Sequence, residues 1–211
     1  MKQTIICIIL LLIQAKTFCQ NSDSITKLFY PPGLVKKKIE KEKITYADSL
    51  VSSIDYGFSI DLQTKKEFNG WGYVNGCIFS VDNNVGSLQF WLQDYGSKYN
   101  FSREMVNQVM KSPEVFLEEM RNSVKKSGYT ISSDHIKAVT VGGLPAFQYV
   151  CDIIGKDLYG QPLSSRIIKT EVFYKSYHFY TFCIFNIEES TYVNEWQGLN
   201  EFWISQIHFN E

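Results

Sequence analysis

The sequence predicts an α+β fold with a central antiparallel β-sheet of about six to seven strands and helices on both of its faces. A pair of amphipathic helical segments lies in the middle of the sequence. Before and after it, apolar and polar residues alternate, as in half-buried strands. The links between the later strands are short, which indicates antiparallel neighbours because a parallel return needs a longer crossover. The last long strand, 177–187, has aromatic residues in both registers, which is typical of a strand covered on both faces.

The individual elements follow from alternation, helical spacing and turn residues. Alternation over 54–60 predicts the first strand. One helix is expected to start at Ser102, and a second at Ser112 and Pro113, which Gly128 ends. The remaining strands are expected at 74–81, 87–93, 130–141, 145–154, 165–174, 177–187 and 204–209, and a last amphipathic helix at 192–203.

The N-terminus predicts an export signal. Lys2 precedes an uncharged ten-residue run, which is too short to cross a bilayer but typical of the apolar part of a secretory signal. Cleavage after Cys19 would leave Gln20 as the first residue, and cleavage after Thr17 is the alternative. Phe18 stands where a lipoprotein signal needs a small residue. We therefore expect a soluble periplasmic or secreted product with no stable membrane anchor.

Three parts of the chain are distinguished by composition. Residues 1–19 are the predicted signal peptide, 20–50 a polar segment or tether, and 51–211 a single α+β domain. The run 36–43 has five lysines and two glutamates around one isoleucine, so it has no apolar face to insert into a membrane. We expect it to be a solvated helix or a tether.

The composition after the signal excludes two classes of protein. Loss of the leader takes the net charge from −1 to −3, which does not favour nucleic acid as a partner. Cys77, Cys151 and Cys183 remain, and an odd number is no disulfide scaffold. In a simple meander, Cys151 and Cys183 lie two strand spacings of ~4.8 Å apart, beyond the ~7 Å that a disulfide spans. We expect no bond between them and three buried free thiols.

The order of the elements resembles the PsbP-like family over about 52–209. The resemblance is carried by Tyr-Gly-Phe-Ser-Ile at 56–60, Gly-Leu-Pro-Ala at 143–146, and a helix that runs into Phe-Trp-Ile-Ser-Gln-Ile-His-Phe at 202–209. It implies an antiparallel sheet flanked by helices and a non-catalytic binding or assembly module. The family includes extrinsic proteins of photosystem II, a Ran-binding factor and exported bacterial proteins. The chain departs from it at 65–70, where many members have a proline shortly before the tryptophan.

Catalytic, metal and cofactor sites are not predicted. The histidines His135, His178 and His208 are far apart, and neither HExxH nor CxxC occurs. His178 lies between aromatic residues of a strand and is interpreted as a sheet histidine. Asp134 and His135 are adjacent in a strand, so their side chains point to opposite faces and form no dyad.

Two tryptophans are candidate partner-binding residues. Trp91 shares a strand face with polar residues, which favours either an exposed partner site or burial beneath a helix. Trp71, in a glycine-rich turn, is similarly ambiguous. The sequence therefore supports an exported binding or assembly module with an unknown protein partner. The alternative is a carrier of a small apolar ligand between sheet and helices. A remote alternative is a hydrolase in which His178 or His135 meets a carboxylate and a hydroxyl.

Overall fold

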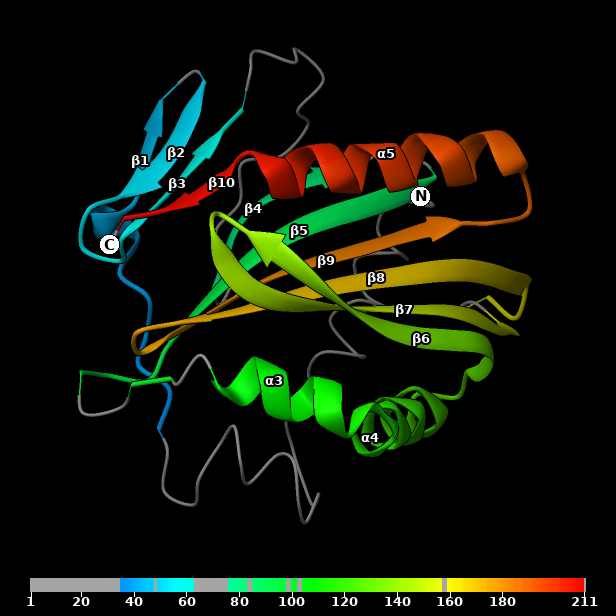
Figure 1. Cartoon of the computed structure of the whole chain (residues 1–211). Coiled ribbons are helices and arrows are strands. Elements are labelled where there is room, and N and C mark those ends of the chain that lie inside the picture. Colours follow the sequence, from blue (N-terminus) through cyan, green and yellow to red (C-terminus); the bar gives the residue numbers. More distant parts are fainter. Residues whose placement is uncertain are drawn as a thin grey trace.

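The computed structural model describes residues 35–47, 49–62, 76–82, 85–97, 100–101, 104–156 and 159–210. Within these ranges, two antiparallel sheets and three α-helices form the fold (Figure 1). The strands are β1 (Thr45–Ala47), β2 (Leu50–Ser53), β3 (Phe58–Asp61), β4 (Cys77–Asp82), β5 (Gly86–Asp94), β6 (Thr130–Val141), β7 (Leu144–Lys156), β8 (Pro162–Tyr174), β9 (Tyr177–Asn186) and β10 (Ile207–Phe209). The helices are η1 (Lys41–Lys43, a short 3-10 helix), α3 (Glu104–Lys111), α4 (Pro113–Lys126) and α5 (Ser190–Ser205). The antiparallel α+β class is confirmed.

The main sheet has the strand order β4-β5-β9-β8-β7-β6. Strands β6 to β9 follow one another as the predicted meander, because each link is a short reversal. Gly142 and Gly143 join β6 to β7 with φ values of +53° and +80°, a left-handed conformation that suits glycine in a hairpin turn. The long central strands therefore lie next to their neighbours in sequence.

The small sheet, β1-β2-β3-β10, was not predicted. The expected single strand over 54–60 is wrong, because residues 54–57 form a turn between β2 and β3. Gly57 adopts a φ of +67° there, which reverses the chain although the alternation of apolar residues continues through it. Ile54 is 95% exposed at this turn. The final strand β10 pairs with β3 and so joins the small sheet instead of closing the main one.

The described residues 35–44, which precede the small sheet, pack against the domain. Ile39 and Ile44 flank η1 and are both buried in the core. The backbone N–H of Lys37 donates to the carbonyl of Asp94 at 2.7 Å, which ties the segment to the end of β5. The expected helix over 36–43 is reduced to the three residues of η1, because the isoleucines hold the chain against the core.

The helices lie on opposite sides of the main sheet in Figure 1, α5 on one side and α3 with α4 on the other. Alternate residues of β9 belong to two different buried clusters, as expected for a strand covered on both faces. Phe179 and Phe185 join the cluster of α5, whereas Phe182 and Ile184 join that of α3 and α4. Within the described ranges, no helix is long and apolar enough to cross a membrane.

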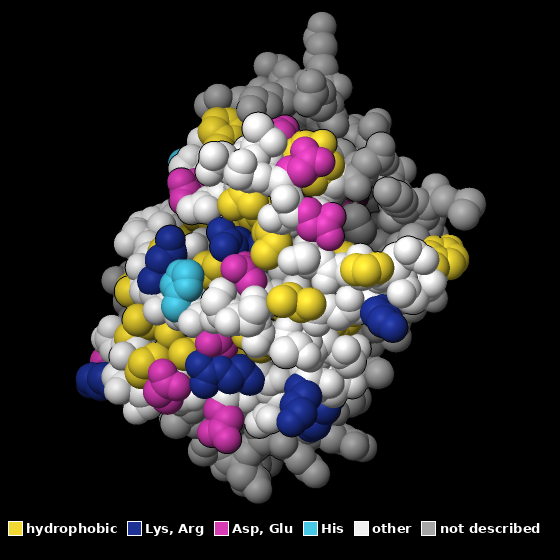
Figure 2. Space-filling model, turned by 90° about the vertical axis from the view of Figure 1, so that its right-hand side faces the viewer, with side chains coloured by type: hydrophobic (Ala, Val, Ile, Leu, Met, Phe, Trp, Pro, Cys, Tyr) yellow, Lys and Arg dark blue, Asp and Glu magenta, His cyan; other side chains and the backbone are white. Residues whose placement is uncertain are grey.

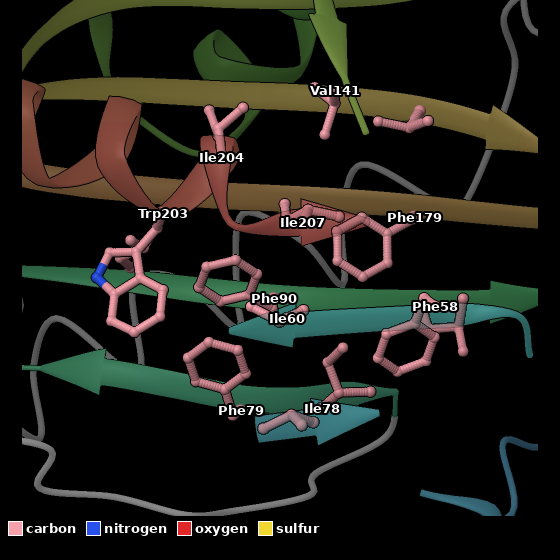
Figure 3. Close-up of a cluster of buried hydrophobic side chains, with 14 of the residues drawn as sticks. Phe58, Ile60, Ile78, Phe79, Phe90, Val141, Phe179, Trp203, Ile204 and Ile207 are labelled. Carbon is pink, nitrogen blue, oxygen red and sulfur yellow. The ribbon is translucent and has the colours of Figure 1, made fainter. Parts of the chain in front are cut away.

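Aromatic side chains fill the space between α5 and the main sheet. Phe79 of β4 and Phe90 of β5 stack with their ring centroids 4.1 Å apart. Trp203 of α5 meets both rings edge-on, at 5.9 Å from Phe79 and 6.1 Å from Phe90 (Figure 3). Further along α5, Trp196 stacks on Phe185. This side of the sheet is therefore a closely packed apolar core.

Candidate functional site

The predicted site residues are only partly brought together. Trp91 and His178 lie on the same face of neighbouring strands, the face that also carries Phe182 and Ile184. His135 is exposed on β6, and His208 is exposed on β10. Trp71, Cys19 and Gln20 lie outside the described residues. The candidate site is consequently the polar region around Trp91 and His178.

Five residues define this region, and we call them the polar array: Trp91 on β5, Lys169 and Glu171 on β8, and His178 and Tyr180 on β9. Lys169 and Glu171 are two residues apart in a strand, so they share a face, and the same holds for His178 and Tyr180. The register places Tyr180 between Glu171 on one side and Trp91 on the other. The array thus runs across three adjacent strands.

The centre of the array is a buried charged cluster. The two carboxylate oxygens of Glu171 are engaged separately: Oε1 lies 2.7 Å from Lys169 Nζ, and Oε2 lies 2.8 Å from His178 Nε2. The side chains are 6%, 12% and 0% exposed for Glu171, Lys169 and His178. The Lys169 ammonium and the Glu171 carboxylate therefore neutralise each other in a site shielded from solvent. The His178 imidazole contacts the second oxygen of the same carboxylate.

The surroundings shift the pKa values of this cluster in ways that fix its charge. Burial raises the pKa of Glu171, but Lys169 and His178 outweigh burial and bring it down to about 2. Burial lowers the pKa of His178, and Glu171 opposes that effect while Lys169 and Lys36 add to it. At neutral pH, Glu171 is thus a carboxylate and His178 a neutral imidazole.

Aromatic rings enclose the charged cluster. The ring of Phe173 stacks on His178 with the centroids 4.5 Å apart, and the ring of Tyr180 lies 5.0 Å away. Lys169 Nζ stands 5.1 Å from the centre of the Tyr180 ring, a cation–π contact. Burial raises the pKa of the Tyr180 phenol well above its usual value, and the Glu171 carboxylate adds to the effect. The phenol therefore stays protonated.

Trp91 is buried against the array and not exposed for a partner. Its exposed fraction is 7%, and its ring stacks parallel to that of Tyr180 at 5.9 Å. Its Nε1 donates to Gln89 Oε1 at 3.0 Å. A polar neighbour in the same strand therefore supplies the hydrogen-bond acceptor that the buried indole N–H needs. Of the two alternatives for Trp91, the structure shows the buried one, and a role in partner binding stays a prediction.

The three cysteines that the structure describes, Cys77, Cys151 and Cys183, are free and buried. Strand β8 separates Cys151 from Cys183, and the two belong to clusters on opposite faces of the main sheet. Burial raises the pKa of Cys151 to about 12 and raises that of Cys183 further above its usual value. Both are therefore protonated thiols, which are poor nucleophiles.

Comparison with known proteins finds similarity to solved structures but not to family models or curated proteins. The solution structure of cyanobacterial PsbP (CyanoP) from Synechocystis sp. PCC 6803 is similar to 78% of this chain and 95% of its own, with 13% identity and a TM-score of 0.44. A likeness of this degree assigns neither a family nor a function to the chain, so the PsbP-like resemblance of the sequence stays a prediction.

The chemistry open to the array is limited by its own contacts. A histidine beside a carboxylate is one part of a general base, but the His178 ring is 0% exposed and enclosed by aromatic rings. Among the described residues, no group of three or more His, Cys, Asp or Glu side chains is placed to hold a metal ion. The arrangement suits charge neutralisation inside the sheet better than reaction with a substrate.

Sequence reasoning found His178 and Trp91 but missed Lys169 and Glu171. The signal was present: two opposite charges at spacing two in a predicted strand must share one face. Charged residues in strands are usually interpreted as solvated. Only the neighbouring strand, which brings His178 to Glu171, shows that they are buried.

Proposed function

We propose that the chain is an exported, non-enzymatic binding or assembly module that recognises a protein partner with its surface. The observation that best supports this proposal is that the charged cluster is shielded from solvent. Glu171 is shared between Lys169 and His178, and all three side chains are largely removed from water. A hydrolase would need that imidazole within reach of a substrate and a hydroxyl.

The packing of the α5 side favours a binding module over a carrier of a small apolar ligand. A carrier needs a cavity between sheet and helix, and Phe79, Phe90 and Trp203 fill that interface with ring contacts (Figure 3). On the face shown in Figure 2, basic and acidic side chains are interspersed with separate hydrophobic ones. Such a mixed surface favours a protein partner over a polyanion.

The proposal is tested by crosslinking and affinity capture of the tagged full-length chain from its native cell envelope. We expect one partner that also binds the purified chain in a two-component assay. The control is an unrelated exported protein with the same tag. N-terminal sequencing of the recovered chain should give Gln20 as the first residue, and an uncleaved or lipid-modified N-terminus would contradict the expected processing.

A parallel measurement tests the enzymatic alternative. The purified protein is assayed against a panel of ester and peptide substrates, together with His178→Gln, whose folding is checked by circular dichroism. We expect no turnover from either protein. Turnover by the wild type that folded His178→Gln lacks would overturn the proposal and favour a hydrolase.

A further inference from the structure

Strand β6 forms one outer edge of the main sheet. It is twelve residues long, and in the part of the chain that the structure describes, β7 is the only strand that pairs with it. The register with β7 is regular from Ser133 to Val141, after an irregularity near Ile131. An edge of this length presents a row of backbone groups that another extended segment can pair with.

The hairpin turn identifies which backbone groups are open. The two glycines of the turn close the hairpin on the pair Val141 and Leu144, and a two-residue turn closes on a hydrogen-bonded pair. Antiparallel ladders alternate, so every second residue of β6 bonds to β7 and the others point outward. The outward N–H and C=O groups belong to Asp134, Ile136, Ala138 and Thr140.

The side chains of the strand give this edge a positive charge. Asp134 is held by Arg121, with Oδ2 at 2.7 Å from Nε, on the side of α4. His135 and Lys137 are exposed on the opposite face of the strand. Within the described ranges, Lys137 makes no ion pair. On β7, Asp152 lies opposite Ser133 and is neutralised by Arg166 at 2.7 Å. The unneutralised charge of the edge is therefore that of Lys137.

We propose that the outer edge of β6 binds an extended segment of a partner protein, which adds a strand to the main sheet and places an acidic side chain beside Lys137. The inference rests on the proposed function and names the surface and the chemistry of the partner. Backbone hydrogen bonds to the outward groups supply the pairing. Cross-strand pairs of opposite charge stabilise a sheet. Lys137 therefore favours a segment that places an acidic side chain directly across from it.

A second copy of this chain fits the edge less well. Two β6 strands that pair antiparallel in one continuous sheet keep the same residues on the same face. This pairing gathers His135 and Lys137 of both copies on that face, and like charges across strands are destabilising. Charge complementarity therefore selects a foreign acidic segment over a homodimer.

The experiment uses the folded protein and a fluorescent eight-residue peptide that alternates glutamate and valine, with a lysine–valine peptide as its charge-reversed counterpart. We expect the acidic peptide to bind in anisotropy titrations and to slow the hydrogen exchange of the Asp134, Ile136, Ala138 and Thr140 amides. Lys137→Glu should weaken binding of the acidic peptide by about three- to tenfold, because an attractive cross-strand pair becomes a repulsive one, and should favour the lysine peptide.

The edge itself is tested with proline. Ala138→Pro removes an outward N–H and leaves the ladder to β7 intact, so the variant should stay folded and lose peptide binding. Ala138→Val keeps the N–H and should bind like the wild type. Equal binding by Ala138→Pro, absence of exchange protection, or a β6-dependent dimer in sedimentation would overturn the inference. If the partner captured from the envelope binds Ala138→Pro as well as it binds the wild type, the proposed function stands and this edge is not its site.

Discussion

The two faces of the main sheet are both buried, but different interactions hold them. Under α5, Phe79, Phe90 and Trp203 meet ring against ring, and shape complementarity decides the packing. On the other face of the same sheet, which we call the polar face, Glu171 is held between Lys169 and His178, beside a second apolar cluster under α3 and α4. The aromatic cluster under α5 is stabilised by area removed from water, whereas the polar array is stable only while each charge keeps its partner.

This difference separates what each face contributes. Buried ion pairs often contribute little net stability relative to apolar residues of the same volume, yet they are costly to break. We therefore attribute most of the stability of this region to the aromatic core. The register of β8 and β9 brings Glu171 to His178, so we expect the polar array to favour this pairing of the strands over others.

The largest expected effect is on the apolar face. Phe90→Ala removes a ring that is 0% exposed and contacts both Phe79 and Trp203. It should lower the free energy of unfolding by about 4 kcal/mol, in the range for phenylalanine truncation in a core. Chemical denaturation followed by circular dichroism measures it.

The matched control lies next to Phe90 on the polar face of β5. Gln89→Ala removes the acceptor of the Trp91 indole N–H and should cost about 1 kcal/mol, as for one hydrogen bond. If Gln89→Ala destabilises the protein as much as Phe90→Ala, the stability is not concentrated on the apolar face and the comparison fails.

The second prediction concerns the charged cluster. Glu171→Leu leaves the Lys169 ammonium and the His178 imidazole without their carboxylate, which should lower the free energy of unfolding by about 2–3 kcal/mol. The expected loss is below the ~3–5 kcal/mol of a fully buried pair, because Lys169 is 12% exposed and can turn toward water. Urea denaturation at pH 7 measures it.

A triple variant sharpens this result. Lys169→Met, Glu171→Leu and His178→Phe together replace the cluster by apolar side chains and should restore the stability to within about 1 kcal/mol of the wild type. A triple variant that is less stable than Glu171→Leu alone would show that the charges themselves stabilise the sheet. The two faces would then differ less than we infer.

The sequence predicts the main sheet much better than the small one. The meander of β6 to β9 has glycine or other short turns between long alternating strands, so local signals and final structure agree. The turn at 54–57 breaks a strand whose alternation continues on both sides, and alternation alone does not show it. Pairing of β10 with β3 depends on residues about 150 positions apart, for which local patterns give no signal.

The candidate site shows the same limit. Spacing places Lys169 with Glu171 and His178 with Tyr180, each pair on one face of its strand. Whether that face is solvated or buried depends on the neighbouring strands and on what covers them. The sequence could therefore give the composition of the polar array but not its burial, and it left the exposure of Trp91 open for the same reason.

The smallest expected effect is the pH dependence that His178 adds to the polar face. Burial lowers its pKa in the folded state, so the unfolded chain takes up a proton first as the pH falls. Its contribution to stability is complete above the unfolded value of about 6.5 and is lost as the pH falls from there toward the folded pKa. Glu171 opposes the shift, and its own contribution is lost later, from about pH 4.3 toward about 2. Urea midpoints between pH 7.5 and 5 should therefore fall more steeply for the wild type than for His178→Gln. Parallel curves would mean that the imidazole has the same proton affinity folded and unfolded, and that the polar face does not restrain it.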